Sequence, residues 1–445
     1  MKLHPWQTEL MADPVLKVLR KEPIALLTAG TGAGKTLAGL HIARALNLMP
    51  FVVAPKVTLP AWRETAEAMG IEMVDAMNVE KMKGGKTKYL NRTGKRFTWQ
   101  LSDTHALLII DEAHMFCGDG TLNAHILAAT HQLIASAGKV RPYRIPVLLM
   151  SATLGETPLK FEDAVGYLLG FHNRKNGRDW VLKHGCYINQ WFKPEFPRGK
   201  SRIPYLEKLH KEIYPRFGVS LKHADIPGFP KNQIITELVS IKPKELKELQ
   251  GAYDRYEELD KFEKTRDVLA GKDENALTIQ LRARQMSEIA KIPSFVEQTR
   301  NLLAEGGSVV IFTSFRETMD ILAQKFRAEH PAIVRGGQKA KAQEAHVVRF
   351  QAGKTRVCLV AIQAGGVGLS LPNLDPRSAR YSIMSPPQSA VHYVQALGRI
   401  WRANSIGVSI QYLLIAQNTV EEKIAKNLET KTQNMEMIHD SDFWN

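Results

Sequence analysis

The chain has little cysteine and no long apolar run, and each lack excludes a class of protein. Among its 445 residues the only cysteines are Cys117, Cys186 and Cys358, and no two lie at CxxC spacing. Neither a disulfide framework nor a cysteine zinc site is expected, and a reducing cytoplasm suits the chain. No run of about 18 or more apolar residues is present, and the amino terminus does not resemble a signal peptide. We therefore expect no membrane association.

Acidic residues are outnumbered by basic ones, 45 to 60, which gives a formal net charge of +15. Such a surface attracts polyanions, with nucleic acid the first candidate and an anionic membrane the second. Hydrophobic residues make up 44% of the chain and charged residues 24%, a balance typical of globular proteins. Because domains usually have about 100–200 residues, the length indicates two domains as the simplest organisation.

Short apolar runs that end in loops alternate with helix-like stretches such as Thr36–Leu46. The first series of runs comprises Ile24–Thr28, Phe51–Ala54, Ala106–Ile110 and Ile145–Met150. The second series comprises Ser308–Phe312, Ala332–Val334, Arg356–Ala361, Tyr381–Met384 and Val408–Ile415. This alternation predicts two α/β domains, each a parallel sheet flanked by helices.

Composition indicates where these domains begin and end. Residues 189–230 are rich in proline and aromatics and indicate irregular structure, whereas residues 245–298 indicate helices that precede the second sheet. Thr419 and Glu422 have capping-box spacing and predict the start of the last helix. We therefore expect a first domain over residues 1–240, a second over 241–430, and an acidic tail over 431–445.

A glycine-rich segment follows the first predicted strand and precedes a helix, as a phosphate-binding loop requires. Its residues are Ala29, Gly30, Thr31, Gly32, Ala33, Gly34, Lys35 and Thr36. Glycines let backbone N–H groups close around a phosphate, and the helix amino terminus adds its positive dipole end. We expect Lys35 to reach the β and γ phosphates of ATP and the Thr36 hydroxyl to hold Mg²⁺. A glycine-rich turn without a ligand is the alternative.

A DEAH sequence follows the strand Ala106–Ile110, at the carboxyl end where open α/β sheets bind ligands. We expect Asp111 to hold Mg²⁺ and Glu112 to orient and deprotonate the attacking water. The same four residues could begin a solvated helix, but the preceding phosphate loop favours catalysis. His114 is expected in a coupling network rather than at a metal, because no second ligand lies at metal spacing. SAT, Ser151–Thr153, follows the next strand and could also be a simple helix cap.

Arg399 and Arg402 lie three residues apart in QALGRIWR, and would share one face if the segment were helical. Such a pair can stabilise charge on a transferring phosphoryl group, as an arginine finger does. A basic surface helix is the alternative.

A basic segment without acidic residues has aromatics among or beside it, namely Tyr89, Phe97 and Trp99. Its basic residues are Lys81, Lys83, Lys86, Lys88, Arg92, Lys95 and Arg96. Basic residues neutralise phosphates and aromatics can stack on exposed bases, so we predict a loop that contacts a duplex or its fork. A solvated loop is the alternative. Trp62 and Trp401 are expected to pack in the protein rather than stack on bases.

With these motifs in this order, the chain resembles superfamily 2 helicases, and among them the Swi/Snf-type DNA translocases. LHPWQ (Leu3–Gln7) is similar to the family's adenine-reading segment and VVAPKVTLPAWRE (Val52–Glu64) to its motif Ia. VVIFTSFRET (Val309–Thr318), AIQAGGVGLSL (Ala361–Leu371) and QALGRIWR are similar to motifs IV, V and VI.

The resemblance implies two tandem RecA-like domains that use ATP and Mg²⁺ to move on DNA. It implies a nucleotide contact for Gln7 and Gly368, and a catalytic role for Gln395 beside Arg399 and Arg402. It further implies DNA contacts at Lys56, Ser314 and Gly366.

The chain also departs from the family. RFGVSLKH (Arg216–His223) stands where a paired arginine is usual, and Ala403–Ser405 lacks the usual Gly-Gln. The accessory domains of remodellers are absent, so we expect a compact bacterial or phage enzyme, acting in the bacterial cytoplasm or a phage-infected host, rather than a nucleosome remodeller.

These features give an ATP-dependent translocase or helicase on double-stranded or branched DNA as the first hypothesis. An RNA helicase and a motor-derived subunit of a defence or restriction complex are the alternatives, and a small-molecule kinase would leave the second domain unexplained. The tail DSDFWN could bind a replication or recombination protein through its acidic and aromatic residues, although a frayed terminus is the default.

Overall fold

The computed structural model describes residues 2–85, 87–101, 105–118, 120–135, 145–162, 164–173, 175–243, 247, 276–362 and 369–439. The chain divides into two compact units. The N-terminal unit comprises Met1–Phe229 with Thr432–Phe443, and the C-terminal unit comprises Pro230–Lys431 with the last two residues. Among the described helices, none combines the length and the apolar character needed to cross a bilayer.

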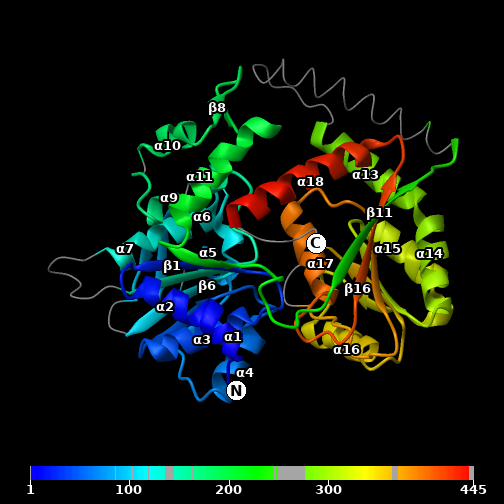
Figure 1. Cartoon of the computed structure of the whole chain (residues 1–445), viewed down its shortest axis with the longest axis horizontal. Coiled ribbons are helices and arrows are strands. Elements are labelled where there is room, and N and C mark those ends of the chain that lie inside the picture. Colours follow the sequence, from blue (N-terminus) through cyan, green and yellow to red (C-terminus); the bar gives the residue numbers. More distant parts are fainter. Residues whose placement is uncertain are drawn as a thin grey trace. The chain divides into compact units, whose positions relative to one another are not determined.

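The N-terminal unit contains a six-stranded sheet of order β10-β1-β7-β6-β2-β3, in which every neighbouring pair is parallel (Figure 1). Its strands are β1 (Ile24–Ala29), β2 (Met49–Val53), β3 (Asp75–Met77), β6 (Ala106–Asp111), β7 (Val147–Ser151) and β10 (Gly218–Leu221). Since the strands are parallel, the loops that follow them meet at one edge, which is where ligands bind in such sheets.

Helices cover both faces of this sheet, and successive residues of a strand pack on opposite faces. In β1, Leu27 packs with Leu40 and Trp62 on one face, whereas Leu26 packs with Ile126 and other residues on the other. The first face carries α1 (Pro5–Gln7), a π-helical turn (Thr8–Ala12), α2 (Asp13–Leu19), α3 (Lys35–Ala45) and α4 (Leu59–Ala68). The other elements are α5 (Val79–Lys83), a 3-10 turn (Ala113–Phe116), α6 (Leu122–Ala129), α7 (His131–Ile134), α8 (Leu159–Glu162), α9 (Val165–Leu168), α10 (Gly177–Lys183), a 3-10 turn (Lys200–Arg202) and α11 (Ile203–Ile213).

Two antiparallel hairpins extend the N-terminal unit. The first joins β4 (Leu90–Thr93) to β5 (Arg96–Trp99), and the second joins β8 (Tyr187–Ile188) to β9 (Pro194–Glu195). The first lies where the sequence predicted a basic loop, and its described residues form a hairpin instead of a loop. The reason is the alternation along β5, whose residues are exposed and buried in turn.

The C-terminal unit contains a second six-stranded parallel sheet, of order β11-β16-β15-β12-β14-β13 (Figure 1). Its strands are β11 (Asn232–Val239), β12 (Ser308–Thr313), β13 (Ala332–Val334), β14 (Val357–Ala361), β15 (Arg380–Met384) and β16 (Ser409–Ala416). The flanking elements are α13 (Ala276–Ala290), α14 (Ile292–Ala304), α15 (Arg316–Lys325), a 3-10 turn (Arg327–Glu329), α16 (Ala340–Gln351), α17 (Ala390–Ile400) and α18 (Val420–His439). The predicted fold, two parallel sheets flanked by helices, is confirmed.

The boundaries differ from those expected. β11 pairs with β16 along its whole length, so the C-terminal unit begins at Pro230 rather than at residue 241. β10 is a strand within the segment that was expected to be irregular. Helix α18 continues through the expected start of the tail at residue 431, because Met435, Ile438 and His439 are buried at helical spacing. The rest of the predicted tail lies outside the described residues.

Helix α18 belongs to both units and is held in each. In the C-terminal unit, its Glu421 accepts a hydrogen bond from the fully buried Lys291, which also donates to the Leu414 carbonyl at 2.6 Å. In the N-terminal unit, His439 accepts from the Leu154 amide at 3.3 Å and lies 3.2 Å from the Tyr214 hydroxyl. Both anchors are buried, so neither end of this helix is a loose terminus.

Candidate functional site

The phosphate loop connects β1 to α3, and the side chains of Gln7 and His223 pack closely against it. Gly32 and Gly34 have φ values of +83° and +84°, a conformation that favours glycine. A Cβ atom at Gly34 would lie 2.2 Å from the side-chain nitrogen of Gln7, and one at Gly30 would lie 1.9 Å from Nε2 of His223. Glycine is therefore needed at Gly34 for both backbone conformation and space, at Gly32 for conformation and at Gly30 for space.

Gln7 is buried against this loop. Its Nε2 donates to the Ala33 carbonyl at 3.1 Å, and its Oε1 accepts from the His4 amide at 2.9 Å. The side chain is thus fixed at both ends beside the loop.

The Lys35 side chain folds back over the loop. Its Nζ donates to the carbonyls of Ala29 and Gly30 at 2.8 and 3.1 Å. Thr36 is half-buried in the first turn of α3. The loop therefore presents an ammonium group and a hydroxyl at a helix amino terminus, which suits a phosphate with its cation.

Asp111 ends β6 and is buried in this site. Its Oδ2 accepts from the Trp62 indole N–H at 3.0 Å, and its Oδ1 accepts from the Glu112 amide at 3.0 Å. Burial and the neighbouring Glu112 carboxylate raise the pKa of Asp111 to about 6, although Lys35 and the two hydrogen bonds act in the opposite direction. Asp111 is buried beside a second carboxylate, that of Glu112, and a divalent cation would stabilise these two negative charges. The oxygen ligands at this site therefore fit Mg²⁺.

The DEAH and SAT segments form one hydrogen-bonded network. Glu112 has a left-handed backbone, with φ of +53°, and its Oε2 lies 3.2 Å from Nδ1 of His114. The same nitrogen lies 3.1 Å from the Ser151 hydroxyl, which donates to the Thr153 carbonyl at 2.6 Å. The predicted place of His114 in a network is consistent with these contacts. Within the described ranges, no three His, Cys, Asp or Glu residues are grouped as a metal site.

His223 is a residue of this site that sequence reasoning missed. It follows β10, which pairs with β1, and its buried ring packs on Gly30 and lies 4.7 Å from the ring of Phe229. It occupies the segment that departs from the family's paired arginine. β10 has only four residues and lies among prolines, so no sequence signal placed it beside the phosphate loop.

In the C-terminal unit, Arg399 and Arg402 converge on one backbone carbonyl. Arg399 Nη1 and Arg402 Nη2 donate to the Leu369 oxygen at 2.9 and 2.8 Å. Helix α17 ends at Ile400, so the two arginines do not share a helix face as expected. Gln395 and Arg399 are buried within α17. Gly366 and Gly368 lie outside the described residues.

Two of the residues with an implied nucleic-acid contact follow strands. Lys56 is exposed in the turn after β2. Ser314 follows β12, and its amide donates to the buried Glu288 carboxylate at 3.0 Å. A cavity of about 350 Å³ beside Ser314 is lined by Arg316 and Arg335 among others. This part of the C-terminal unit is therefore hollowed and basic.

The basic hairpin β4–β5 differs from expectation in its aromatic residues. Tyr89, Phe97 and Trp99 are buried, and Phe51 packs edge-on against Tyr89 and Trp99, so these rings belong to the core and the prediction that they stack on bases is wrong. The basic side chains that are described are exposed or half-buried, namely Lys81, Lys83, Lys88, Arg92, Lys95 and Arg96, while Lys86 lies outside the described residues. A cavity of about 470 Å³ beside the hairpin is lined by Lys95, Arg96 and two histidines, among others. Trp62 and Trp401 are buried, as predicted.

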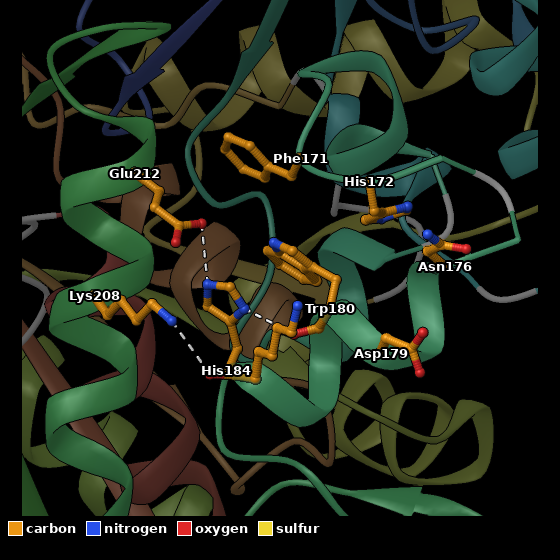
Figure 2. A pocket seen from close by; sticks show the side chains of 9 residues that line it. Phe171, His172, Asn176, Asp179, Trp180, His184, Lys208 and Glu212 are labelled. Atoms are coloured by element: carbon orange, nitrogen blue, oxygen red, sulfur yellow. Dashed lines mark hydrogen bonds and ion pairs between the residues drawn. The ribbon is translucent and has the colours of Figure 1, made fainter.

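A further cavity of about 410 Å³ lies between α10 and α11 (Figure 2). Figure 2 shows the His184 imidazole between two acceptors, with Nε2 3.0 Å from the Glu212 carboxylate and Nδ1 2.8 Å from the Trp180 carbonyl. The Trp180 ring lies between Phe171 at 5.7 Å and His184 at 4.1 Å. Both faces of the indole are occupied, so this cavity offers no free ring on which a base could stack.

Comparison with known proteins agrees with the fold and with the order of the motifs. The model of the helicase conserved C-terminal domain matches residues 291–404. A protein of Acanthamoeba polyphaga mimivirus that carries the name of an ATP-dependent RNA helicase, L364, is 28% identical over 99% of this chain and 84% of its own length. The DNA repair and recombination protein RAD54 of Saccharomyces cerevisiae is 28% identical over 26% of this chain, which spans only 13% of that protein.

A solved structure has the same fold. S. cerevisiae Dbp5 bound to RNA and ADP BeF3 matches with a TM-score of 0.51 and 12% identity, over 95% of this chain and 87% of that one. Together with the two parallel α/β units, these likenesses support a superfamily 2 helicase, and the helicases of this kind are ATP-hydrolysing enzymes.

The raised pKa of Asp111 predicts a pH-dependent cost in stability. Because the folded protein holds the Asp111 proton more tightly than the unfolded chain, the ionised form destabilises the ligand-free fold above about pH 6. Asp111→Asn should therefore raise stability by about 3 kcal/mol at pH 8, and the gain should shrink toward zero near pH 4. Thermal unfolding across this pH range measures the effect.

Asp179→Asn, at an exposed position in α10, serves as the matched control for the loss of one negative charge. A gain for Asp111→Asn that stays constant from pH 4 to pH 8 would contradict the assignment.

Proposed function

We propose that this protein is an ATP-dependent DNA translocase or helicase that couples ATP hydrolysis to movement on double-stranded or branched DNA. The observation that carries the proposal has two parts. Lys35 acts electrostatically on Asp111 at the sheet edge. The adjacent Glu112 belongs to a network that extends through His114 to Ser151 and Thr153. A motor must pass the conformational effect of ATP hydrolysis from the nucleotide site to other elements. The contacts from Glu112 to Thr153 supply a physical route for this coupling.

The proposed roles follow from the geometry of the N-terminal unit. Gln7 would read the base, and backbone amides from Ala29 to Thr36 would bind the phosphates with Lys35. Thr36 and Asp111 would hold Mg²⁺, which supplies positive charge that neutralises the phosphates when bound. Glu112 would orient the attacking water and accept its proton, with its carboxylate steered by His114 at 3.2 Å.

The C-terminal unit supplies the arginines of this proposal. Arg399 and Arg402 would stabilise charge on the transferring phosphoryl group, with Gln395 as their neighbour in α17 and Gly368 of motif V near the nucleotide. The hydrogen bonds of both arginines to Leu369 tie them to the end of motif V, so a change in that segment would move both guanidinium groups.

The proposed DNA contacts are phosphate contacts. Lys56, Ser314 and Gly366 would bind the backbone, as the resemblance implies, and the exposed basic side chains of Lys81–Arg96, Lys86 included, would neutralise further phosphates. The partial matches to proteins named for DNA repair and chromatin remodelling support DNA as the polymer. A compact bacterial or phage enzyme of the Swi/Snf type remains part of the proposal, as does binding of a replication or recombination protein by the C-terminal tail.

RNA is the second candidate polymer, and one observation favours it. The viral relative named as an RNA helicase matches over 99% of this chain, whereas the relatives named for DNA repair or remodelling match over at most half of it. The two candidates make opposite predictions about which polymer stimulates turnover.

The proposal is tested by measuring ATP turnover with duplex DNA, single-stranded DNA, forked DNA and RNA of matched length and concentration. We expect duplex or forked DNA to raise kcat at least tenfold over the rate without nucleic acid, and RNA to raise it less. Stronger stimulation by RNA would establish the second candidate, and no stimulation by any polymer would contradict a nucleic-acid motor.

Glu112→Gln tests the proposed catalytic base. The amide keeps the size of the side chain but cannot accept the proton, so we expect turnover to fall by a factor of about 10²–10⁴ while ATP and DNA still bind. Filter binding with labelled ATP and anisotropy with labelled DNA check that both affinities persist. Glu64→Gln, at an exposed position in α4, is the matched control, and retained turnover in Glu112→Gln would remove Glu112 from this role.

A further inference from the structure

The hairpin β8–β9 carries two aromatic side chains at its turn. Phe192 has 83% of its surface exposed, more than the other large hydrophobic residues described as exposed, and Trp191 has 36% exposed. Phe192 also has a left-handed backbone, with φ of +59°, which is unusual for a bulky residue and costs conformational energy. The packing of Phe192 in the fold therefore does not explain its strained backbone.

The turn holds these side chains in a fixed frame. Asn189 Oδ1 accepts from the amides of Trp191 and Lys193 at 2.9 and 3.0 Å, and the Asn189 carbonyl accepts from the Phe192 amide at 3.0 Å. Glu195 in β9 accepts from Nδ2 of Asn189 at 2.8 Å and from the hydroxyl of Tyr187 in β8 at 3.0 Å. The turn is therefore ordered by its own hydrogen bonds before any partner binds.

The base of the hairpin is fixed to the N-terminal unit. His184 lies two residues before Cys186 and is held between Glu212 of α11 and the Trp180 carbonyl of α10 (Figure 2). At the end of α11, the Tyr214 hydroxyl lies 2.7 Å from that of Thr28 in β1, directly before the phosphate loop. The aromatic turn is thus carried by elements that contact the nucleotide-binding strand.

Positive charge in the segment around the turn favours a negatively charged partner. Lys193, Arg198 and Lys200 are exposed in the same segment as the two rings. The only acidic residue within residues 187–200 is Glu195, and it is engaged by Tyr187 and Asn189. Aromatic rings flanked by cations fit a polymer that offers flat apolar faces and negative charge together, which is an unpaired nucleotide. A protein partner of this turn would have to present both apolar and acidic groups.

We propose that Trp191 and Phe192 form a stacking site for unpaired bases of nucleic acid, separate from the motor's phosphate contacts. The site rests on the proposed function, because it needs a nucleic-acid substrate with bases out of the duplex. It would let the enzyme hold a single strand at a fork or branch, since a base in a continuous duplex is stacked on its neighbours and has no free face.

The test compares a single-stranded oligonucleotide with an abasic oligomer of the same length, which keeps the phosphates and lacks the bases. We expect the wild-type chain to bind the oligonucleotide at least tenfold more tightly than the abasic oligomer. Trp191→Ala with Phe192→Ala should abolish most of this difference by weakening oligonucleotide binding about tenfold or more, and should leave the Kd of the abasic oligomer unchanged. Leu182→Ala, at an exposed apolar position in α10, is the matched control and should keep the difference.

Fluorescence gives a second readout that does not depend on a destabilising variant. The emission difference between the wild-type chain and Trp191→Phe isolates Trp191, and it should be quenched by the oligonucleotide and not by the abasic oligomer. An equal loss of both ligands in the double alanine variant would overturn base stacking, as would unchanged binding of both. If the proposed function itself fails, no nucleic acid will stimulate ATP turnover by the wild-type chain. That result is distinct from failure of the stacking site, which leaves the stimulation intact.

Discussion

The buried negative charge of Asp111 is the constraint on which the N-terminal unit depends. Removing a carboxylate from water is unfavourable, and the second carboxylate of Glu112 beside it adds repulsion. Trp62, buried in α4, and the backbone of Glu112 offset part of this cost with hydrogen bonds. Helix α4, the end of β6 and the phosphate loop therefore all surround the Asp111 carboxylate. Its negative charge destabilises the fold until a cation or a proton binds, so the site gives up stability for function.

A continuous set of contacts leads from this charge to helix α18. Glu112 contacts His114, His114 contacts Ser151, and the chain after Thr153 donates to His439 through the Leu154 amide. Burial lowers the pKa of His439 to about 3, so this imidazole is neutral at physiological pH and can accept at Nε2 while its Nδ1 hydrogen bonds with Tyr214. Helix α18 begins in the C-terminal unit, where its Glu421 accepts from Lys291, and its last residues belong to the N-terminal unit.

Much of this structure could be predicted from the sequence, since apolar runs and motif residues follow simple rules. All nine predicted strands are present to within about two residues at each end, because each is a run of buried residues in a sheet covered on both sides. β3, β10 and β11 were missed because none of them is a continuous apolar run: their sequences are DAM, GVSL and NQIITELV. His223 was missed for the same reason as β10, since only the pairing with β1 brings it to Gly30.

The aromatic residues show where composition alone misleads. Tyr89, Phe97 and Trp99 were expected to meet nucleic acid because they lie among lysines and arginines, but alternation in a hairpin sends them into the core. Trp191 and Phe192 lie in a segment that composition described only as irregular, yet their turn exposes them on an ordered frame. The hydrogen bonds of Asn189 fix the conformation of this turn, and no periodicity in the sequence predicts them.

The proposed mechanism requires the arginines of the C-terminal unit as well as the phosphate loop of the N-terminal unit for hydrolysis. The direct measurement is the nucleic-acid-stimulated kcat and the ATP affinity of Arg399→Ala, with Arg377→Ala at an exposed arginine as the control for lost charge. We expect kcat to fall about 10³-fold or more in Arg399→Ala, while ATP affinity changes little and the control turns over normally. Full turnover in Arg399→Ala would contradict this mechanism.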